Sequence, residues 1–382
     1  MSEVQPKDFG FGEDEAMLRD AAARFFSDNL PADRLHALVA ADSDPHRDNR
    51  CQWDPDLWRQ IVELGWTAVC VPEANGGVGM PLVAAVALAE QAGHAGFPAP
   101  LQATLMSTAV LRACHTDAAG EALAKVAEGR AMSLAMSNAQ GGLEPEDTAV
   151  TVDADGNLHG TAHFVQEARK VQTFLVSARS EAGVGLYLVD AGADGLVIAP
   201  DVIIDLTRDQ ATLSFADVSA IEVAAPGQGE AALLEALPAM LCIVSADMVG
   251  AGEWLLQTTA EYATTRVQFD RPIGFFQAIK HPLVNLMVEI DNAKSLTYNA
   301  ACAIDIDADD ALQLARMAKA QASDMAVFSG SRAVQFHGGI GFTWECYVQM
   351  FFKRQMHSQM LLGDAPYQRR KLAAMMIGPV AA

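Results

Sequence analysis

The sequence predicts an α+β protein in which two helical domains flank a central domain of short β-strands. Three observations carry this prediction. Apolar residues recur at helical spacing through the first third of the chain and again from about residue 233 onward. Between residues 131 and 224 the period changes to two, in short runs separated by turn residues. A Pro-Gly-Gln-Gly linker then follows at 226–229. We therefore expect domains at residues 1–130, 131–227 and 228–382.

The first domain is expected to be mainly helical. Asp54 and Pro55 have the residue types of an N-cap and a first helical position. The glycine-rich stretch 73–79 lacks the Lys-Ser/Thr ending of a phosphate-binding P-loop, so it is interpreted as a tight turn. Residues 40–49 are expected to form a polar loop and residues 65–72 a short extended run. Helices are predicted at residues 14–29, 53–64, 81–95, 101–113 and 118–127.

The central domain is expected to be a small barrel or sandwich, because several short strands follow one another at regular spacing. Turn residues such as those at 155–157 and 192–195 separate the strands. The predicted strands lie near residues 134–136, 149–152, 173–177, 186–189, 196–198, 211–215 and 221–223.

The third domain begins with two long apolar-periodic segments, at about 233–265 and 276–303. The residues between them predict a turn, so the pair is interpreted as an αα-hairpin. The turn carries basic and amide side chains at a helix junction, where anions bind readily. The alternating carboxylates at 305–310 lack the glycine and glutamate of an EF-hand calcium loop. We interpret them as a solvated acidic turn that caps a helix starting near Ala311.

Composition excludes several classes of protein. The formal charge of −22 argues against a nucleic-acid surface, which requires a basic patch. The six cysteines are scattered without metal-ligand spacing, so reduced core thiols and no metal are expected. The N-terminus lacks the pattern of a signal peptide, and no apolar run approaches the length of a membrane span. A cytoplasmic protein without membrane attachment is predicted.

Two motifs resemble those of a known family. Residues 262–281, Tyr-Ala-Thr-Thr-Arg-Val-Gln-Phe-Asp-Arg-Pro-Ile-Gly-Phe-Phe-Gln-Ala-Ile-Lys-His, are similar to the C-terminal signature of acyl-CoA dehydrogenases. Residues 335–343, Gln-Phe-His-Gly-Gly-Ile-Gly-Phe-Thr, resemble that family's glycine-rich flavin loop. The order of the motifs and of the domains agrees with this family of flavoprotein oxidoreductases.

The resemblance implies a central β-barrel domain and a C-terminal four-helix bundle. It also implies FAD as cofactor, an acyl-CoA substrate in fatty acid or lipid metabolism, and electron-transfer flavoprotein or another acceptor. The chain would associate with itself or with a homologous subunit as a dimer or tetramer. In the family, the C-terminal domain of a neighbouring subunit binds the adenine and pyrophosphate half of FAD. The residues carried over to that role are Arg266, Gln268, Phe269, Gln277, Gln335, Gly338 and Gly339.

The flavin-ring half of the resemblance is weaker. Ser137 stands where relatives carry a Thr, but Asn138 replaces the following Glu. On a second strand, Phe164 is expected to stack on the ring, and Glu167 would place a negative charge near it. We therefore expect Ser137 and Phe164 to contact the flavin.

The catalytic base is missing from its usual position. Leu362 occupies the place where most relatives carry a Glu, and leucine accepts no proton. A minority of relatives place the Glu early in the first C-terminal helix, where this chain has about Met240, with Glu235 nearby. Asp364 is the other candidate. Both carboxylates also have structural interpretations, Glu235 near a helix N-terminus and Asp364 as an N-cap.

Three functions therefore compete. The first is an FAD-dependent acyl-CoA dehydrogenase, or a subunit of one. The second is a catalytically silent subunit that completes the FAD site of a base-bearing homologous chain in a hetero-oligomer. The third is a flavin-assisted reaction on a non-standard thioester within the same fold. The usual catalytic base is absent, whereas the residues that would bind the FAD of a neighbouring subunit match the family's motifs. This combination favours the second function as the alternative to the first.

Overall fold

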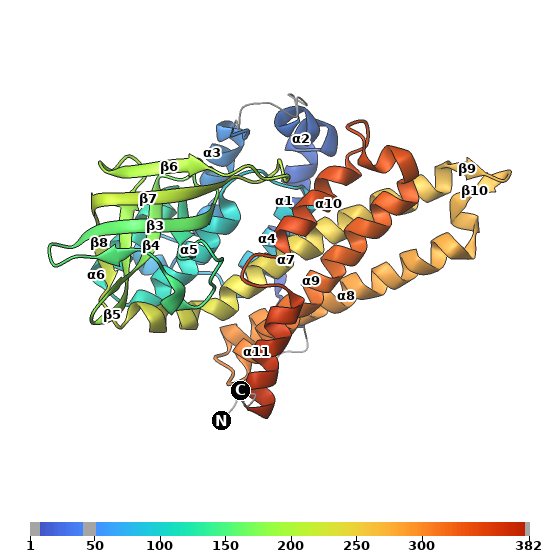
Figure 1. Cartoon of the computed structure of the whole chain (residues 1–382). Helices are drawn as coiled ribbons and strands as arrows, with labels where there is room; N and C mark the ends of the chain where they lie inside the picture. The colour runs from blue at the N-terminus through green and yellow to red at the C-terminus, as the bar shows by residue number, and fades with distance from the viewer. Residues whose placement is uncertain (1–7, 41–50, 379–382) are drawn as a thin grey trace.

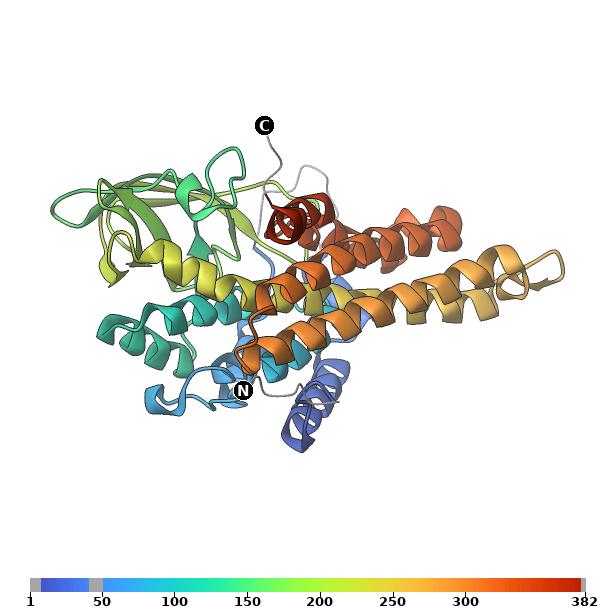
Figure 2. The same cartoon turned by 90° about the horizontal axis from the view of Figure 1, so that it is seen from below.

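The computed structural model describes residues 8–40 and 51–378. Its elements follow the predicted order: helices, a sheet, then helices (Figure 1). The sheet lies at one end of the molecule. The long helices of the third domain extend away from it towards a small hairpin, as Figure 2 shows from below. The predicted fold class is confirmed.

The N-terminal helices match the predicted ones closely. Asp54 caps α3 as predicted, because its carboxylate accepts the amide hydrogens of Asp56 and Leu57. The helix α2 (Ala32–Val39) was not predicted, and the loop expected at 40–49 falls almost entirely outside the described residues. The other bounds are α1 (Glu13–Asn29), α3 (Pro55–Glu63), α4 (Leu82–His94), α5 (Leu101–Cys114) and α6 (Asp117–Ala127).

The extended run expected at 65–72 is wrong. Trp66–Ala68 form a 3₁₀ turn, because Gly65 before them has the left-handed φ of 75° that closes α3. Trp66, Val69 and Val71 are buried, so this run is apolar because it packs in the core. The turn predicted at 73–79 is confirmed, with Gly76 and Gly79 at positive φ.

The central domain is one curled sheet of eight strands. Its pairs follow the order β6-β7-β3-β2-β4-β5-β8, and β1 pairs with β4 in parallel. The first and last strands of this pairing order are β6 and β8. The strand bounds are β1 (Met132–Ala135), β2 (Thr151–Val152), β3 (Asn157–Gln166), β4 (Thr173–Ser180), β5 (Gly183–Asp190), β6 (Leu196–Pro200), β7 (Gln210–Ser219) and β8 (Ile221–Ala224).

The C-terminal domain packs α8 and α9 side by side on α7, with α10 and α11 near the sheet end (Figure 1). The predicted αα-hairpin is confirmed, and a two-stranded hairpin forms its turn. The bounds are α7 (Gly229–Thr265), β9 (Val267–Gln268), β10 (Arg271–Pro272), α8 (Gln277–Asp305), α9 (Ala311–His337), α10 (Val348–Ser358) and α11 (Ala365–Ile377).

The helix α7 corrects the expectation about membrane spans. Within the described residues it is the one helix long and apolar enough to cross a membrane. Its most apolar window is 78% buried inside the protein. The helix is therefore apolar because it forms the centre of the helical core.

Small residues let α4 and α7 cross at close range. A Cβ on Gly250 would lie 1.8 Å from the carbonyl oxygen of Glu90, and one on Gly93 would lie 2.1 Å from that of Asp247. No side chain fits at either position. Close helix packing therefore explains these glycines.

The acidic turn at 305–310 caps a different helix from the one expected. The carboxylate of Asp305 accepts the amide hydrogens of Leu82 (2.7 Å) and Val83 (3.0 Å) at the start of α4. Asp310 stands at the N-cap position of α9, but its side chain forms no capping hydrogen bond. The turn therefore ties the third domain to the first.

Candidate functional site

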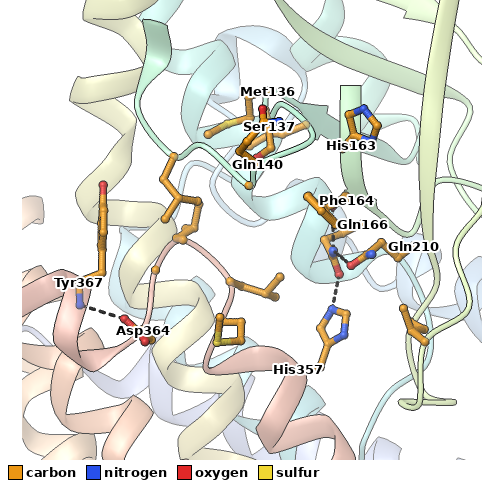
Figure 3. A pocket seen from close by; sticks show the side chains of 18 of the residues that line it. Met136, Ser137, Gln140, His163, Phe164, Gln166, Gln210, His357, Asp364 and Tyr367 are labelled. Atoms are coloured by element: carbon orange, nitrogen blue, oxygen red, sulfur yellow. Dashed lines mark hydrogen bonds between the residues drawn. The ribbon is translucent and has the colours of Figure 1, made fainter. Parts of the chain in front are cut away.

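A cavity of about 780 Å³ lies where the sheet meets α5, α10 and the loop before α11. Its wall is mostly apolar, with a few polar side chains that converge from different elements (Figure 3). Such a cavity at a domain junction is typical of small-molecule sites. The polar groups determine what can bind there.

One side of the cavity carries a chain of hydrogen-bonded side chains (Figure 3). Gln166, at the end of β3, donates to the carbonyl of Phe164 and to the amide oxygen of Gln210. Its own amide oxygen lies 2.7 Å from Nε2 of His357 on α10. Burial lowers the pKa of His357 to about 4, so the imidazole is neutral and donates its Nε2 hydrogen to Gln166.

The two side chains predicted to contact a flavin ring both line this cavity. Ser137 follows β1, and its carbonyl accepts the amide hydrogen of His163. Phe164 has a positive φ of 59° beside a bulge in the β3–β7 pairing. A bulge redirects side chains, and Phe164 is 45% exposed and lines the cavity. The fold brings these residues together.

Asn138 and Glu167, which are neighbours of these residues in the sequence, do not present their side chains to the cavity. Asn138 accepts the amide hydrogens of Gln140 and Gly142, so its side chain organises its own loop. Glu167 is 2% exposed, and its carboxylate pairs with Lys170 at 2.6 Å. It does not line the cavity, and the expectation of a negative charge beside the flavin ring is wrong.

The candidate bases occupy separate environments. Leu362 lines the cavity. Asp364 lines it too, but its carboxylate accepts the amide hydrogen of Tyr367 at 2.9 Å and caps α11. Glu235 lies on α7 away from the cavity, 62% exposed and 3.8 Å from the ring of His115. Met240 is buried beside a second, smaller pocket. The helix-capping interpretation of Asp364 is confirmed.

Buried hydrogen bonds from α9 and α11 fix the loop that carries Leu362. Lys319 on α9 is fully buried and donates to the carbonyls of Gln359 (2.9 Å) and Gly363 (2.8 Å) and to Ser323 (2.9 Å). Gln368 donates to the carbonyl of Leu362. Leu362 has a left-handed φ of 57°, a costly conformation for leucine, and these contacts maintain it.

The buried Lys319 predicts a pH-dependent stability. Burial lowers its pKa from 10.5 to about 7. Between these values the unfolded chain binds more protons than the folded one, so stability rises with pH. The contribution reaches up to about 1.4 kcal/mol per pH unit. Urea unfolding at several pH values in this window should show a steeper rise for the wild type than for Lys319→Met. Equal slopes would contradict this prediction.

A second group of predicted residues lies at the far end of the long helices, at the β9–β10 hairpin (Figure 1). Arg266, Gln268 and Gln277 are exposed there, and Arg266 forms no ion pair with any described residue. Phe269 and Asp270 have φ values of 55° and 61°, the geometry of a type I′ turn. Phe269 is 86% exposed, and a left-handed phenylalanine costs about 1–2 kcal/mol.

The glycine-rich motif reaches the same region. His337, at the end of α9, stacks on Tyr262 of α7 with ring centroids 4.3 Å apart, which joins the two motifs. Gln335 is exposed on the last turn of α9. A Cβ added to Gly338 or Gly339 would meet no atom within 4 Å. The protein leaves open space above this backbone, as a bound phosphate or nucleotide requires.

Other residues of the site were not predicted. Gln210, His357, Tyr367 and Glu144 lie near the cavity but belong to separate elements. Their spacing along the chain shows no period or motif. Only the packing of α10 and α11 against the sheet brings them together.

The three-domain fold, the cavity against the sheet, and the exposed end that carries Arg266, Gly338 and Gly339 agree with the flavin-dependent dehydrogenase class that the sequence resembles. Models of the "Acyl-CoA dehydrogenase, N-terminal domain" and "Acyl-CoA dehydrogenase, C-terminal domain" families match residues 12–130 and 227–377. The chain belongs to the acyl-CoA dehydrogenase family. It is an oxidoreductase that carries out FAD-dependent α,β-dehydrogenation of an acyl-CoA thioester, or a subunit of such an enzyme.

Comparisons with individual proteins support the same family. The chain is 30% identical to acyl-CoA dehydrogenase IpdE2 of Mycobacterium tuberculosis over 362 residues, covering 94% of this chain and 96% of that protein. The structure resembles that of the "Tcur3481-Tcur3483 steroid ACAD G363A variant", with a TM-score of 0.84, 29% identity and coverage of 96% and 98%. Butyryl-CoA dehydrogenase from Megasphaera elsdenii shares the fold, with a TM-score of 0.85, 22% identity and coverage of 96% and 98%.

Proposed function

We propose that this chain is the subunit of a mixed acyl-CoA dehydrogenase assembly that completes the FAD site of a homologous, base-bearing chain. The observation that carries the proposal is Leu362. It lines the cavity, it stands at the position to which the resemblance assigns the family's catalytic Glu, and it cannot accept the α-proton. Neither Asp364, which caps α11, nor the exposed Glu235 is arranged to replace that Glu.

The far end of the molecule supports the FAD-lending role. Arg266 supplies a guanidinium fork for a phosphate, and Gln268, Gln277 and Gln335 supply amides. Gly338 and Gly339 leave room for a close backbone approach. The exposed ring of Phe269 supplies an apolar surface. When bound, FAD accepts the hydride from the substrate's β-carbon. These residues of the chain would hold its adenine and pyrophosphate half.

Ser137 and Phe164 are the residues that would face the ring of a flavin in this chain's own cavity. Gln166, which also lines that cavity, already uses its donor and acceptor groups on Phe164, Gln210 and His357. Side-chain hydrogen bonds to a flavin ring would therefore have to come from other groups on the wall, such as Ser137 and Gln140. Asn138, which stands where relatives carry a Glu, uses its side chain within its own loop, and this supports a weaker ring-binding half in this chain.

Association with a homologous chain has support from the surface. Val284, Met287 and Val288 on α8 and Phe342 after α9 are 46–72% exposed. Val284, Met287 and Val288 share one face of α8, and a contiguous exposed apolar face is typical of subunit interfaces. The similar steroid enzyme carries the names of two proteins, Tcur3481 and Tcur3483, in its description. The electron acceptor, electron-transfer flavoprotein or another, stays a prediction. The cytoplasmic location also stays a prediction.

Co-purification tests the proposal. The chain is expressed alone and together with a homologue that carries the Glu, and FAD content and anaerobic flavin reduction by octanoyl-CoA are measured for each preparation. We expect rapid reduction only in the mixed assembly. If the chain alone binds stoichiometric FAD and reduces it with octanoyl-CoA, the proposal is wrong and the chain is a complete acyl-CoA dehydrogenase.

The two remaining carboxylates give a further prediction. Asp364→Asn keeps the helix cap, and Glu235→Gln changes an exposed side chain, so both should leave the rate of flavin reduction in the mixed assembly within about twofold. Stopped-flow absorbance measures this rate. Loss of a general base lowers the rate by about 100-fold or more, so a drop of that size would identify the altered residue as the base.

A further inference from the structure

The residues predicted to bind FAD lie at the ends of two different helices. Arg266 follows the last residue of α7, whereas Gly338 and Gly339 follow the last residue of α9. All three are exposed to solvent. A diphosphate that contacts both the guanidinium and the glycine backbone requires a fixed spacing between the two helix ends, because a binding site must be held close to its productive geometry.

A pair of stacked rings connects these two helix ends. The rings of His337 and Tyr262 have centroids 4.3 Å apart and an angle of 20° between their planes. His337 is the last residue of α9 and directly precedes Gly338. The carbonyl oxygen of Tyr262 accepts the backbone amide hydrogen of Arg266 at 2.9 Å. The stack therefore lies one residue from the glycines and one hydrogen bond from the arginine.

The surroundings of His337 fix the orientation of its imidazole. The residue is 6% exposed, and its Nδ1 donates to the carbonyl oxygen of Ala333 at 2.9 Å. Burial lowers the pKa of His337, although the hydrogen bond to Ala333 acts in the opposite direction, so the ring is neutral at pH 7. A neutral planar ring packs on tyrosine without the cost of burying a charge. The hydrogen bond thus sets the orientation of the ring, and the stack joins it to α7.

We propose that His337 is a positioning residue for FAD: its stack on Tyr262 holds the guanidinium of Arg266 and the backbone of Gly338 and Gly339 at the spacing that a diphosphate requires. The inference rests on the proposed FAD-lending role of this end. His337 acts through its neighbours and not by touching the cofactor. A site that is already in its binding geometry loses less freedom when the ligand arrives, so the stack raises the affinity by up to its own energy. For one aromatic pair this corresponds to about 2- to 10-fold.

The test measures the dissociation constant of FAD by flavin fluorescence, with apoprotein prepared from the mixed assembly with a base-bearing homologue. His337→Asn keeps a donor for Ala333 but removes the ring, and it should bind FAD about 2- to 10-fold more weakly than the wild type. His337→Phe keeps a ring without the donor and should stay within about twofold of the wild type. His115→Asn is the matched control and should also bind as the wild type does, because His115 is an exposed histidine of the first domain.

Tyr262 allows the stack to be tested from its other side. Tyr262→Leu removes the second ring and should weaken FAD binding by the same factor as His337→Asn. The double variant should bind no more weakly than either single variant, since the stack can be lost only once. Tyr262→Phe keeps the ring and should stay within about twofold of the wild type. Tyr262→Leu decides the matter if His337→Asn does not fold.

Three results would overturn the positioning role. They are equal FAD affinities in the wild type and His337→Asn, equal losses in His337→Asn and His337→Phe, and multiplied losses in the double variant. Failure of the proposed function is seen separately, in Arg266→Ala under the same titration. If Arg266→Ala leaves the FAD affinity unchanged, FAD does not bind at this end and both proposals are wrong. If Arg266→Ala weakens FAD binding and His337→Asn does not, only the positioning role is wrong.

Discussion

An Asp247→Ala variant is expected to lose about 3–5 kcal/mol of its free energy of unfolding. Asp247 is 2% exposed on α7 and pairs with two buried guanidinium groups, those of Arg208 (2.7 Å) and Arg354. Ser358 also donates to it. Removing this carboxylate leaves both arginines buried with too little negative charge, and an unpaired buried charge is far more costly than a lost surface pair.

Urea unfolding of the purified chain measures this loss. Asp324→Ala is the matched control, because Asp324 pairs with Arg369 at the surface, where the two side chains are 49% and 53% exposed. An exposed pair contributes only about 0.2–1 kcal/mol. Similar losses in the two variants would mean that solvent reaches the Asp247 cluster, contrary to its burial.

This cluster also positions the cavity. Arg208 and Thr207 end the loop that follows β6, and that loop supplies residues 202–204 to the cavity wall. Arg354 and Ser358 belong to α10, which carries His357. Asp247 therefore holds the loop and α10 on α7. We expect the variant to lose ligand binding along with stability.

An Arg266→Ala variant is expected to bind FAD about 10- to 100-fold more weakly in the assembled enzyme. Arg266 is exposed, has no ion-pair partner among the described residues and stands beside the strained Phe269 turn. A guanidinium with no structural role of its own is available for a phosphate. The measurement is FAD content by visible absorbance, followed by titration of the apoprotein with FAD.

Two controls separate loss of the cofactor from loss of fold. Arg266→Lys keeps the charge without the bidentate fork and should retain part of the affinity. Arg59→Ala removes an exposed arginine of α3 that pairs with Asp56 and should have no effect. Unchanged FAD affinity in Arg266→Ala would contradict the cofactor-binding role carried over to this end of the molecule.

Local periodicity predicted most of the helices, because a helix that packs one face must repeat its apolar residues every three to four positions. The prediction from periodicity failed for residues 65–72, where a continuous apolar run was interpreted as a short extended segment. Trp66 and Val71 are buried in the segment that contains the 3₁₀ turn. When residues are buried on all sides, their apolar pattern has no period, and a buried turn then cannot be distinguished from a buried strand by sequence. The short helix α2 also escaped prediction.

Capping was predicted correctly where it is local and wrongly where it is not. Asp54 and Asp364 accept amide hydrogens from residues two or three positions later, and their residue types and positions indicated this. Asp305 caps α4 from more than 200 positions away. Nothing in its neighbours along the chain distinguishes it from a solvated carboxylate.

The sequence by itself determined the family, the order of the domains and the absence of a glutamate at position 362. These depend on contiguous motifs and on the residue present at one position. Only the tertiary structure decided that Glu167 turns away from the cavity to Lys170, and that Glu144 meets Tyr367 across two domains. The physical reason is that burial and pairing energies belong to contacts between distant segments, and those contacts exist only once the chain has folded.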